Sequence, residues 1–492
     1  GYGLGDAGEG RNITHNQKKL NKEQLLYFRD RFDIPLNKNE TTNASYYEFT
    51  KNSKEYKYVK KQREALGGPV PTRVDRSKKL KIPEISIFDE LLNGTGEREV
   101  STTMAYVRLL TIITKDKSIG KHVVPIIPDE ARTFGMDPLF RQLGIYAHKG
   151  QLYDPVDSDQ FLYYKEAKNG QILEEGINEA GAMSSFCAAA TSYSNHGIKM
   201  IPFYIYYSMF GFQRVWDLIW ASGDMRSRGF LLGGTAGRTT LNGEGLQHQD
   251  GHSHLAAAAT PNIKAYDVAY GYEIATIIHK GLKEMCEEDK DVVYYLTLEN
   301  ENYVHPAIPK DTADGIIKGL YQMKNHKEPA IRLFGSGPLM NEVLTASEML
   351  KEDWGVDSEV WNVTSFSELR KDAENAKRWN VMHQKNKHKQ SYLEQCITNS
   401  DIPTVAVSDY VKLVTEQIGP YVPGPYYALG TDGFGRSDTR ENLRHFFEVD
   451  RYYIILFAIR ALVNDNKLDE AVINKVIKKY NIDINKPNPL DV

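Results

Sequence analysis

Short hydrophobic runs alternate with longer segments of helical spacing over most of the chain. The runs that follow residue 76 have the length of buried strands, and most are followed by enough residues for a helix. This alternation predicts βαβ units and a largely parallel sheet, so the fold class is α/β. The predicted strands of a first sheet are 122–127, 200–207, 230–232 and 292–298.

A second set of runs predicts a smaller α/β domain from residue 310. Its strands are expected at 330–334, 360–363 and 403–407, with helices at 339–350 and from Tyr452 onward. Before residue 76, the spacing of 18–33 is helical, whereas 37–63 is polar and is interpreted as an excursion or linker. The predicted domains are 1–76, 77–309 and 310–492.

Composition narrows the class of protein. The 492 residues are 41% hydrophobic with a net charge of -4, and the 61 basic residues are scattered, so neither a membrane protein nor a nucleic-acid-binding protein is indicated. The three cysteines are too far apart for a CxxC motif, which favours a reducing compartment, here the cytoplasm. The chain starts at Gly1 as if in mid-domain, and we expect further residues upstream.

Two carboxyl-bearing segments are candidates for acid–base chemistry. Asp129 and Glu130 come directly after a predicted strand, where α/β proteins bind ligands, although this segment alone slightly favours an ordinary ion pair with Arg132. Glu179 precedes a run of small residues predicted as a tightly packed helix. A buried carboxyl there could donate a proton, or it could only stabilise the positive end of the helix.

Three histidines gather in the segment QHQDGHSH, at positions 248, 252 and 254. Their spacing fits no common zinc pattern, so no metal ligand is predicted, whereas a catalytic role for one of them stays open. The nearby segment GGTAGRTT has Arg238 where a phosphate loop has lysine, which excludes it as an ATP site.

Six longer motifs resemble the homodimeric bacterial pyruvate dehydrogenase first component. They occur in the family's order and extend over essentially the whole chain: GDAGEGRNITH, DEARTFGMDPLFRQLGIY, EEGINEAGA, FYIYYSMFGFQR, GRTTLNGEGLQHQDGHSH and GTDGFGRSDTRENLRHFFEVD. The resemblance implies a transketolase-like architecture with a pyrimidine-binding domain at 77–309 and a C-terminal domain beyond it. It also implies thiamine diphosphate and Mg²⁺ as cofactors, whose diphosphate and metal ligands are expected upstream of Gly1.

The same resemblance assigns roles to individual residues. Glu179 matches the glutamate that hydrogen-bonds N1′ of the cofactor's aminopyrimidine, and Phe210 and Tyr207 match aromatic residues at the pyrimidine and in the active-site cavity. His15 and His248 match histidines implicated in substrate handling and acyl transfer. Glu130, with Asp129 beside it, matches an acidic pair near the reacting carbon. Two loops, 9–16 and 149–164, are expected to close over the site.

The function implied is oxidative decarboxylation of pyruvate by a homodimer, with reductive acetylation of the lipoyl domain of a partner dihydrolipoyl acetyltransferase. Two alternatives remain open. The chain could be an inactive fragment that serves as a structural or interaction module, or a transketolase-like transferase that acts on a sugar phosphate. The latter ranks last because the motifs follow the lipoyl-linked family.

Overall fold

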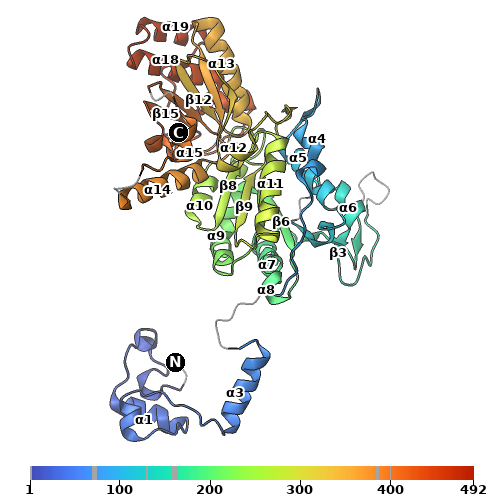
Figure 1. Cartoon of the computed structure of the whole chain (residues 1–492), viewed down its shortest axis with the longest axis vertical. Helices are drawn as coiled ribbons and strands as arrows, with labels where there is room; N and C mark the ends of the chain where they lie inside the picture. The colour runs from blue at the N-terminus through green and yellow to red at the C-terminus, as the bar shows by residue number, and fades with distance from the viewer. Residues whose placement is uncertain (1–2, 69–74, 129–130, 157–163, 384–386, 399–400) are drawn as a thin grey trace. The chain divides into compact units, whose positions relative to one another are not determined.

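The computed structural model describes residues 3–68, 75–128, 131–156, 164–383, 387–398 and 401–492. It divides into two compact units, Gly1–Val74 and Asp75–Val492, which are described separately (Figure 1). The elements of the first unit are η1 Gly5–Ala7, η2 Asn12–Asn16, α1 Lys22–Arg31, α2 Lys38–Thr42 and α3 Lys54–Ala65. The predicted helix at 18–33 is therefore present as α1.

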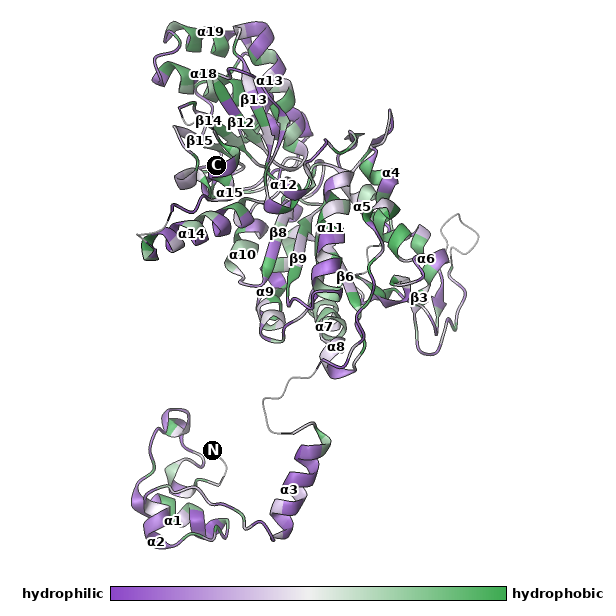
Figure 2. Ribbon diagram, in the orientation of Figure 1, coloured by the Kyte–Doolittle hydropathy of each residue, from purple (hydrophilic) through white to green (hydrophobic). Residues whose placement is uncertain are grey.

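The linker interpretation of residues 37–63 is wrong for much of that segment. Helix α3 contains no buried residue, so it lacks the apolar stripe that marks most helices. It forms from residues of good helix propensity, and the Ser53 side chain caps it by accepting from the Tyr56 N–H at 3.1 Å. Figure 2 shows α3 as hydrophilic along most of its length.

The larger sheet of the second unit has six parallel strands in the order β5-β2-β6-β7-β9-β8. Four predicted strands are confirmed with small shifts at their ends, and β5 and β8 are additional. The bounds are β2 Val123–Ile127, β5 Leu173–Glu174, β6 Ile201–Tyr207, β7 Gly229–Gly234, β8 Ile263–Asp267 and β9 Val293–Thr297.

Both faces of this sheet are covered, which explains why its strands are continuously apolar. Along β6, Phe203 and Ile205 pack on the side of α5 and α11, whereas Tyr204 and Tyr206 pack on the side of α7, α9 and α10 (Figure 1). The helices of this region are α4 Asp89–Leu92, α5 Thr102–Ile113, α6 Pro138–Leu143, α7 Glu179–Ala190, α8 Ser192–Asn195, α9 Ser208–Asp224, α10 Ser253–Ala259 and α11 Gly271–Cys286.

The second sheet has five strands in the order β11-β13-β12-β14-β15, with β11 antiparallel and the others parallel. All three predicted strands are present. The bounds are β11 Tyr321–Lys324, β12 Ile331–Gly335, β13 Ser358–Asn362, β14 Thr404–Val407 and β15 Tyr426–Leu429. The whole chain therefore has the predicted α/β class, with one parallel sheet and a smaller mixed sheet.

Helices also cover both faces of the smaller sheet. Figure 2 shows both hydrophilic and hydrophobic residues along its strands. Helices α13 and α18 pack on one face, and α14 and α15 pack on the other. The helices are α12 Ala313–Lys318, α13 Met340–Trp354, α14 Phe366–Met382, α15 Tyr392–Cys396, α16 Lys412–Glu416, α17 Arg440–Phe446, α18 Arg451–Asn464 and α19 Ala471–Lys479.

Short elements complete the second unit. Two small sheets pair β1 with β10 antiparallel and β3 with β4 parallel. The bounds are β1 Glu99–Val100, β3 Ile145–Tyr146, β4 Glu166–Ala167, β10 Tyr303–Val304, η3 Ile85–Phe88, η4 Gly120–His122, η5 Leu246–His248, η6 Gly337–Leu339 and η7 Gly419–Tyr421. Within the described ranges, no helix is long and apolar enough to cross a membrane.

Buried polar contacts join the two sheets at the loop 235–240. Asp409, which is fully buried, accepts hydrogen bonds from the backbone N–H and the hydroxyl of both Thr239 and Thr240, at 2.7–2.8 Å. Arg238 donates to the carbonyl oxygens of Thr431 and Gly433. The segment that superficially resembles a phosphate loop therefore holds the second sheet against the first.

Candidate functional site

Four predicted site residues lie on elements at the carboxyl end of the six-stranded sheet. Tyr207 is the last residue of β6, Phe210 lies in the first turn of α9, and His248 ends η5. Glu179 is the first residue of α7, which packs beside α9. Ligands of open α/β sheets bind at this end of the strands, so the position suits a functional site.

The aromatic residues and the histidine form one cluster. The ring of His248 stacks on Tyr207 with centroids 5.4 Å apart and meets Phe210 edge-on at the same distance. Tyr207 and Phe210 are themselves 5.9 Å apart, and Phe134 packs against Tyr207 at 5.5 Å. These rings offer aromatic surface next to an imidazole that can transfer protons.

The local sequence explains how the strand and the helix come so close. An added side-chain carbon at Gly211 would meet the ring of Tyr206 at 1.9 Å, so only glycine permits this packing. Helix α9 also bends at Val215, whose backbone angles are not helical. Because of this bend, the first turns of α9, which carry Phe210 and Arg214, run in a different direction from the rest of the helix.

Arg214 connects the aromatic cluster to Glu179. Its guanidinium lies 4.0 Å from the centroid of the Phe210 ring, and its Nη1 donates to Glu179 Oε1 at 2.7 Å. The Glu179 side chain is only 12% exposed. Its burial agrees with the sequence prediction, and the cation of Arg214 lies beside it. No hydrogen bond from a described residue reaches Glu179 Oε2, which leaves that oxygen for a ligand.

His248 has an unsatisfied nitrogen. Its Nδ1 is buried and lies 3.5 Å from a carboxylate oxygen of Glu244, without a hydrogen bond of good geometry to any described residue. Buried polar atoms without a partner are uncommon and often belong to functional sites. The Glu244 carboxylate is positioned to orient the imidazole.

The other histidines of the segment have separate environments. His254 is buried, packs edge-on against Tyr410 at 4.6 Å and has its Nε2 at 3.0 Å from the Thr297 hydroxyl. Burial lowers the pKa of His254, so its ring is neutral at pH 7. The His252 side chain is 42% exposed. Among the described residues, no group of three or more His, Cys, Asp or Glu side chains is placed to hold a metal ion.

The structure does not place three predicted site residues relative to this cluster. Asp129 and Glu130 lie outside the described residues, as does part of the predicted outer loop at 149–164. His15 is exposed on η2 of the first unit, which is described separately from the second. In the predicted loop 9–16, Glu9 accepts from the Gly3 backbone N–H and pairs with Arg31 at 3.3 Å. The roles of His15, Asp129, Glu130 and the two loops stay predictions.

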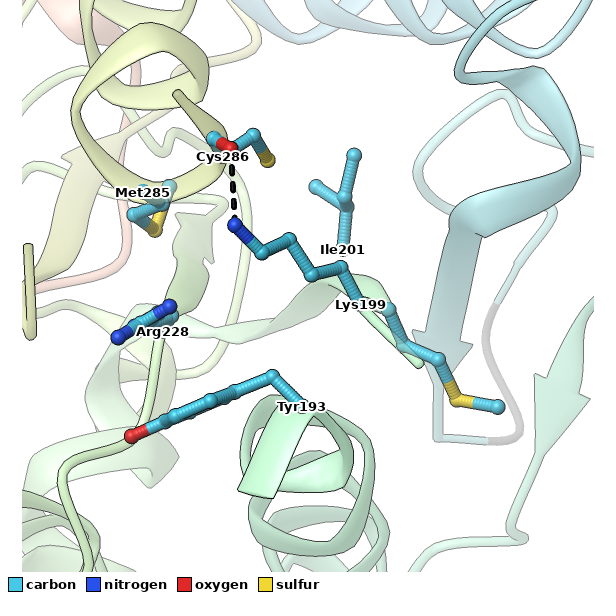
Figure 3. A pocket seen from close by; sticks show the side chains of 7 residues that line it. Tyr193, Lys199, Ile201, Arg228, Met285 and Cys286 are labelled. Carbon is cyan, nitrogen blue, oxygen red and sulfur yellow. Dashed lines mark hydrogen bonds between the residues drawn. The ribbon is translucent and has the colours of Figure 1, made fainter. Parts of the chain in front are cut away.

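Charged residues at the opposite end of the same sheet are fully paired. Lys199 precedes β6 and donates to the Cys286 carbonyl at 2.9 Å, and Arg228 precedes β7 and pairs with Asp291 at 2.9 Å (Figure 3). Tyr193 lies under the Arg228 guanidinium at 3.7 Å. The cavity between them is about 10 Å³, room for a single water molecule. This end of the sheet is structural.

Solved structures identify the class of fold. The transketolase of Campylobacter jejuni aligns with a TM-score of 0.62 over 93% of this chain and 61% of that chain, at 14% identity. The transketolase of Leishmania mexicana aligns with a TM-score of 0.58 over 91% of this chain and 55% of that chain, also at 14% identity. The fold is therefore transketolase-like, as the motifs predicted.

Sequence comparisons identify the family. The model of the pyruvate dehydrogenase E1 component middle domain matches residues 80–306, and that of the transketolase-like C-terminal domain matches 319–450. The pyruvate dehydrogenase E1 components of Cupriavidus necator and Pseudomonas aeruginosa are 52% and 53% identical over 100% of this chain. That of Escherichia coli K12 is 50% identical over 99%. The chain is thus a homologue of this component along its whole length.

The chain spans about half the length of these curated relatives: 56% of the first two and 55% of the third. The comparisons confirm the resemblance predicted from the motifs.

Two residues of the cluster, Arg214 and Glu244, were not among the predicted site residues. Both lie within the quoted motifs. Arg214 follows Phe210 by four residues on a helix, the spacing that places two side chains on one face. That spacing is the sequence feature from which Arg214 could have been predicted as a site residue. Glu244 likewise precedes His248 by four residues, and η5 brings the two side chains together.

Proposed function

We propose that the protein carries out thiamine-diphosphate-dependent oxidative decarboxylation of pyruvate and reductively acetylates the lipoyl group of a partner dihydrolipoyl acetyltransferase. One observation carries the proposal: in a homologue of the pyruvate dehydrogenase E1 component, Glu179, Arg214, Phe210, Tyr207 and His248 form one continuous set of contacts at the carboxyl end of the parallel sheet.

The residues present fit an aminopyrimidine ring. Glu179 has one oxygen held by Arg214 and the other without a hydrogen bond from a described residue, so it can bond a ring nitrogen. Phe210 and Tyr207 supply flat surface for a heterocycle. When bound, thiamine diphosphate supplies the nucleophilic carbon and the electron acceptor for decarboxylation. Glu179 would hold a proton at N1′, and the Arg214 contact would keep the carboxyl in position.

His248 and its neighbours would handle the substrate. The His248 imidazole can exchange a proton with an oxygen of the substrate, and Glu244 is placed to orient the ring. We also assign substrate-handling roles to His15 and to the acidic pair Asp129 and Glu130, on the strength of their family motifs alone.

The remaining family properties are part of the same proposal. The protein would act as a cytoplasmic homodimer and meet the lipoyl domain through the loops 9–16 and 149–164. Mg²⁺ and the diphosphate would be held by family residues outside these 492. Residues 1–76 would be the end of the diphosphate domain, 77–309 the pyrimidine domain and 310–492 the C-terminal domain.

A calorimetric titration with thiamine diphosphate and Mg²⁺, followed by measurement of C2 proton exchange in the bound cofactor, tests the proposal. Glu179→Gln should bind cofactor yet slow this exchange by about 100-fold, the usual scale for losing a positioned proton-transfer group. Glu348→Gln, an exposed glutamate on α13, is the matched control and should exchange at the normal rate.

Undiminished exchange in Glu179→Gln would remove the assignment of that residue. If the chain binds no cofactor at all, the alternative is favoured: these residues then form an inactive structural or interaction module. The support for that alternative is that the chain spans only 56% of the length of these two relatives.

A further inference from the structure

The segment that carries His248 is held at its base by a buried glutamine. Residues 242–247 are exposed, whereas Leu241 and Gln249, on the two sides of the segment, are buried, with Gln249 only 1% exposed. The segment contains two glycines and one short helical element, η5, so its own backbone restricts its conformation little. The position of His248 therefore depends on the contacts that fix the ends of the segment.

Gln249 uses both ends of its side-chain amide. Its Nε2 donates to the carbonyl oxygen of Leu241 at 2.7 Å, and its Oε1 accepts from the backbone N–H of Arg436 at 2.6 Å. The first bond closes the segment into a loop, because it joins the residues on its two sides. The second bond attaches that loop to residues that follow strand β15 of the smaller sheet. An amide supplies both the donor and the acceptor, whereas an ionised glutamate has no donor and a methionine has only a weak acceptor.

The residues between β15 and α17, 430–439, contact the segment at two further points. The carbonyl oxygen of Asp438 accepts from the backbone N–H of Gly243 at 3.0 Å. Gly435 lies so close to η5 that an added side-chain carbon would meet the carbonyl oxygen of Leu246 at 2.6 Å. Residues 430–439 therefore hold the segment before η5, at η5 and, through Gln249, after it.

His248 is the residue of this segment that needs a fixed position. It directly precedes Gln249, and its ring stacks on Tyr207 with centroids 5.4 Å apart and an angle of 25° between the ring planes. The imidazole makes no hydrogen bond of good geometry to a described residue, so the backbone and the stacking determine where the ring lies. A displacement of about 1 Å can slow a reaction about 100-fold, so a proton-transfer group in the proposed active site requires such a support.

We propose that Gln249 is a positioning residue for His248, and that through its amide residues 430–439 of the smaller domain fix the geometry of the proposed active site. Gln249 acts through the backbone that it shares with His248. The smaller domain contains none of the predicted site residues, yet it takes part in the site in this way. The effect on catalysis rests on the proposed function, whereas the effect on the position of the His248 ring does not.

Gln249→Met tests the proposal, because methionine nearly keeps the length of the side chain but cannot donate to Leu241. The readout is the imidazole Cε1–H resonance of His248 in protein with ¹³C-labelled histidine, assigned as the signal that His248→Gln lacks. In the wild type, the π electrons of the stacked Tyr207 ring should shift this resonance away from the value of a free histidine. In Gln249→Met, it should move towards the free value while the circular dichroism of the protein stays native.

Two more variants complete the test. Gln395→Met, at an exposed glutamine of α15 whose amide donates to the Gln390 carbonyl oxygen at 3.3 Å, is the matched control and should leave the resonance unchanged. Gly435→Ala pushes residues 430–439 away from η5 without changing Gln249, so it should move the resonance in the same direction. A glutamine that only stabilised the fold would lower the unfolding temperature of Gln249→Met without moving this native-state signal.

An unmoved resonance in folded Gln249→Met, or in folded Gly435→Ala, would overturn the proposal. Failure of both variants to fold would overturn it as well, since these contacts would then hold the fold together and not the ring. Turnover of pyruvate should fall by about 10-fold or more in both variants. A displaced ring with undiminished turnover would overturn the catalytic part of the proposal but not the proposed function. If the wild type does not turn over pyruvate, the proposed function fails, and the resonance still decides the role of Gln249.

Discussion

Replacing Asp409 with asparagine tests whether the loop 235–240 holds the two sheets together. The carboxylate accepts four hydrogen bonds from Thr239 and Thr240, two to each oxygen. Burial raises the pKa of Asp409, and these donors act against the rise because a protonated carboxyl cannot accept from all four. The asparagine amide has nearly the same shape, but its NH₂ group would face two donors.

The magnitude follows from the groups left without an acceptor. Each buried donor that loses its partner costs about 1–3 kcal/mol, so two donors cost about 2–6 kcal/mol. Since the total stability of a domain is only about 5–15 kcal/mol, the substitution should move its unfolding transition well below that of the wild type.

Urea unfolding, followed by tryptophan fluorescence and by hydrogen exchange of peptides that contain 235–240, measures the effect. Exchange of that loop should accelerate before exchange of β6 does. Asp224→Asn, at the exposed end of α9, is the control and should change stability by less than about 0.5 kcal/mol. A loss below about 1 kcal/mol for Asp409→Asn would refute the idea that these four hydrogen bonds stabilise the packing of the sheets.

Three further predictions concern other buried groups. Burial raises the pKa of Glu273 to about 7. The free energy of unfolding should therefore fall by about 3 kcal/mol as pH rises from 4.5 to 7. In urea titrations, Glu273→Gln should reduce this dependence of the unfolding free energy on pH. Arg444→Met should cost about 3 kcal/mol in thermal unfolding because it leaves Glu301 without its buried cation, whereas Arg451 still pairs with Glu342. Burial raises the pKa of the Cys286 thiol to about 12, so iodoacetamide should label it at pH 8 only after unfolding, as mass spectrometry would show.

Much of the sheet could be predicted because its strands are buried on both faces. The continuous apolar run that ends at Tyr207 predicts strand β6, and a similar apolar run predicts strand β9. Strand β8 was missed because Lys264 interrupts a run of five residues and the strand lies at the sheet edge. Helix α3 was missed for the opposite reason: it buries nothing, so capping and propensity, not hydrophobic periodicity, determine it.

The site could be predicted only in part. The motifs named Glu179, Tyr207, Phe210 and His248, but they could not show that these residues form one set of contacts. That arrangement depends on the packing of α7 beside α9 and on the bend at Val215, which are tertiary features. The guanidinium between Phe210 and Glu179 is a consequence of that packing.

The two ends of the six-stranded sheet use polar residues in opposite ways. At the amino end, Lys199 and Arg228 are buried, and carboxylates and a carbonyl oxygen accept from them, as a structural role requires. At the carboxyl end, the buried Nδ1 of His248 lacks a hydrogen bond from any described residue. The proposed function assigns this nitrogen to the substrate, because a bound molecule would remove the cost of leaving a buried polar atom without a partner.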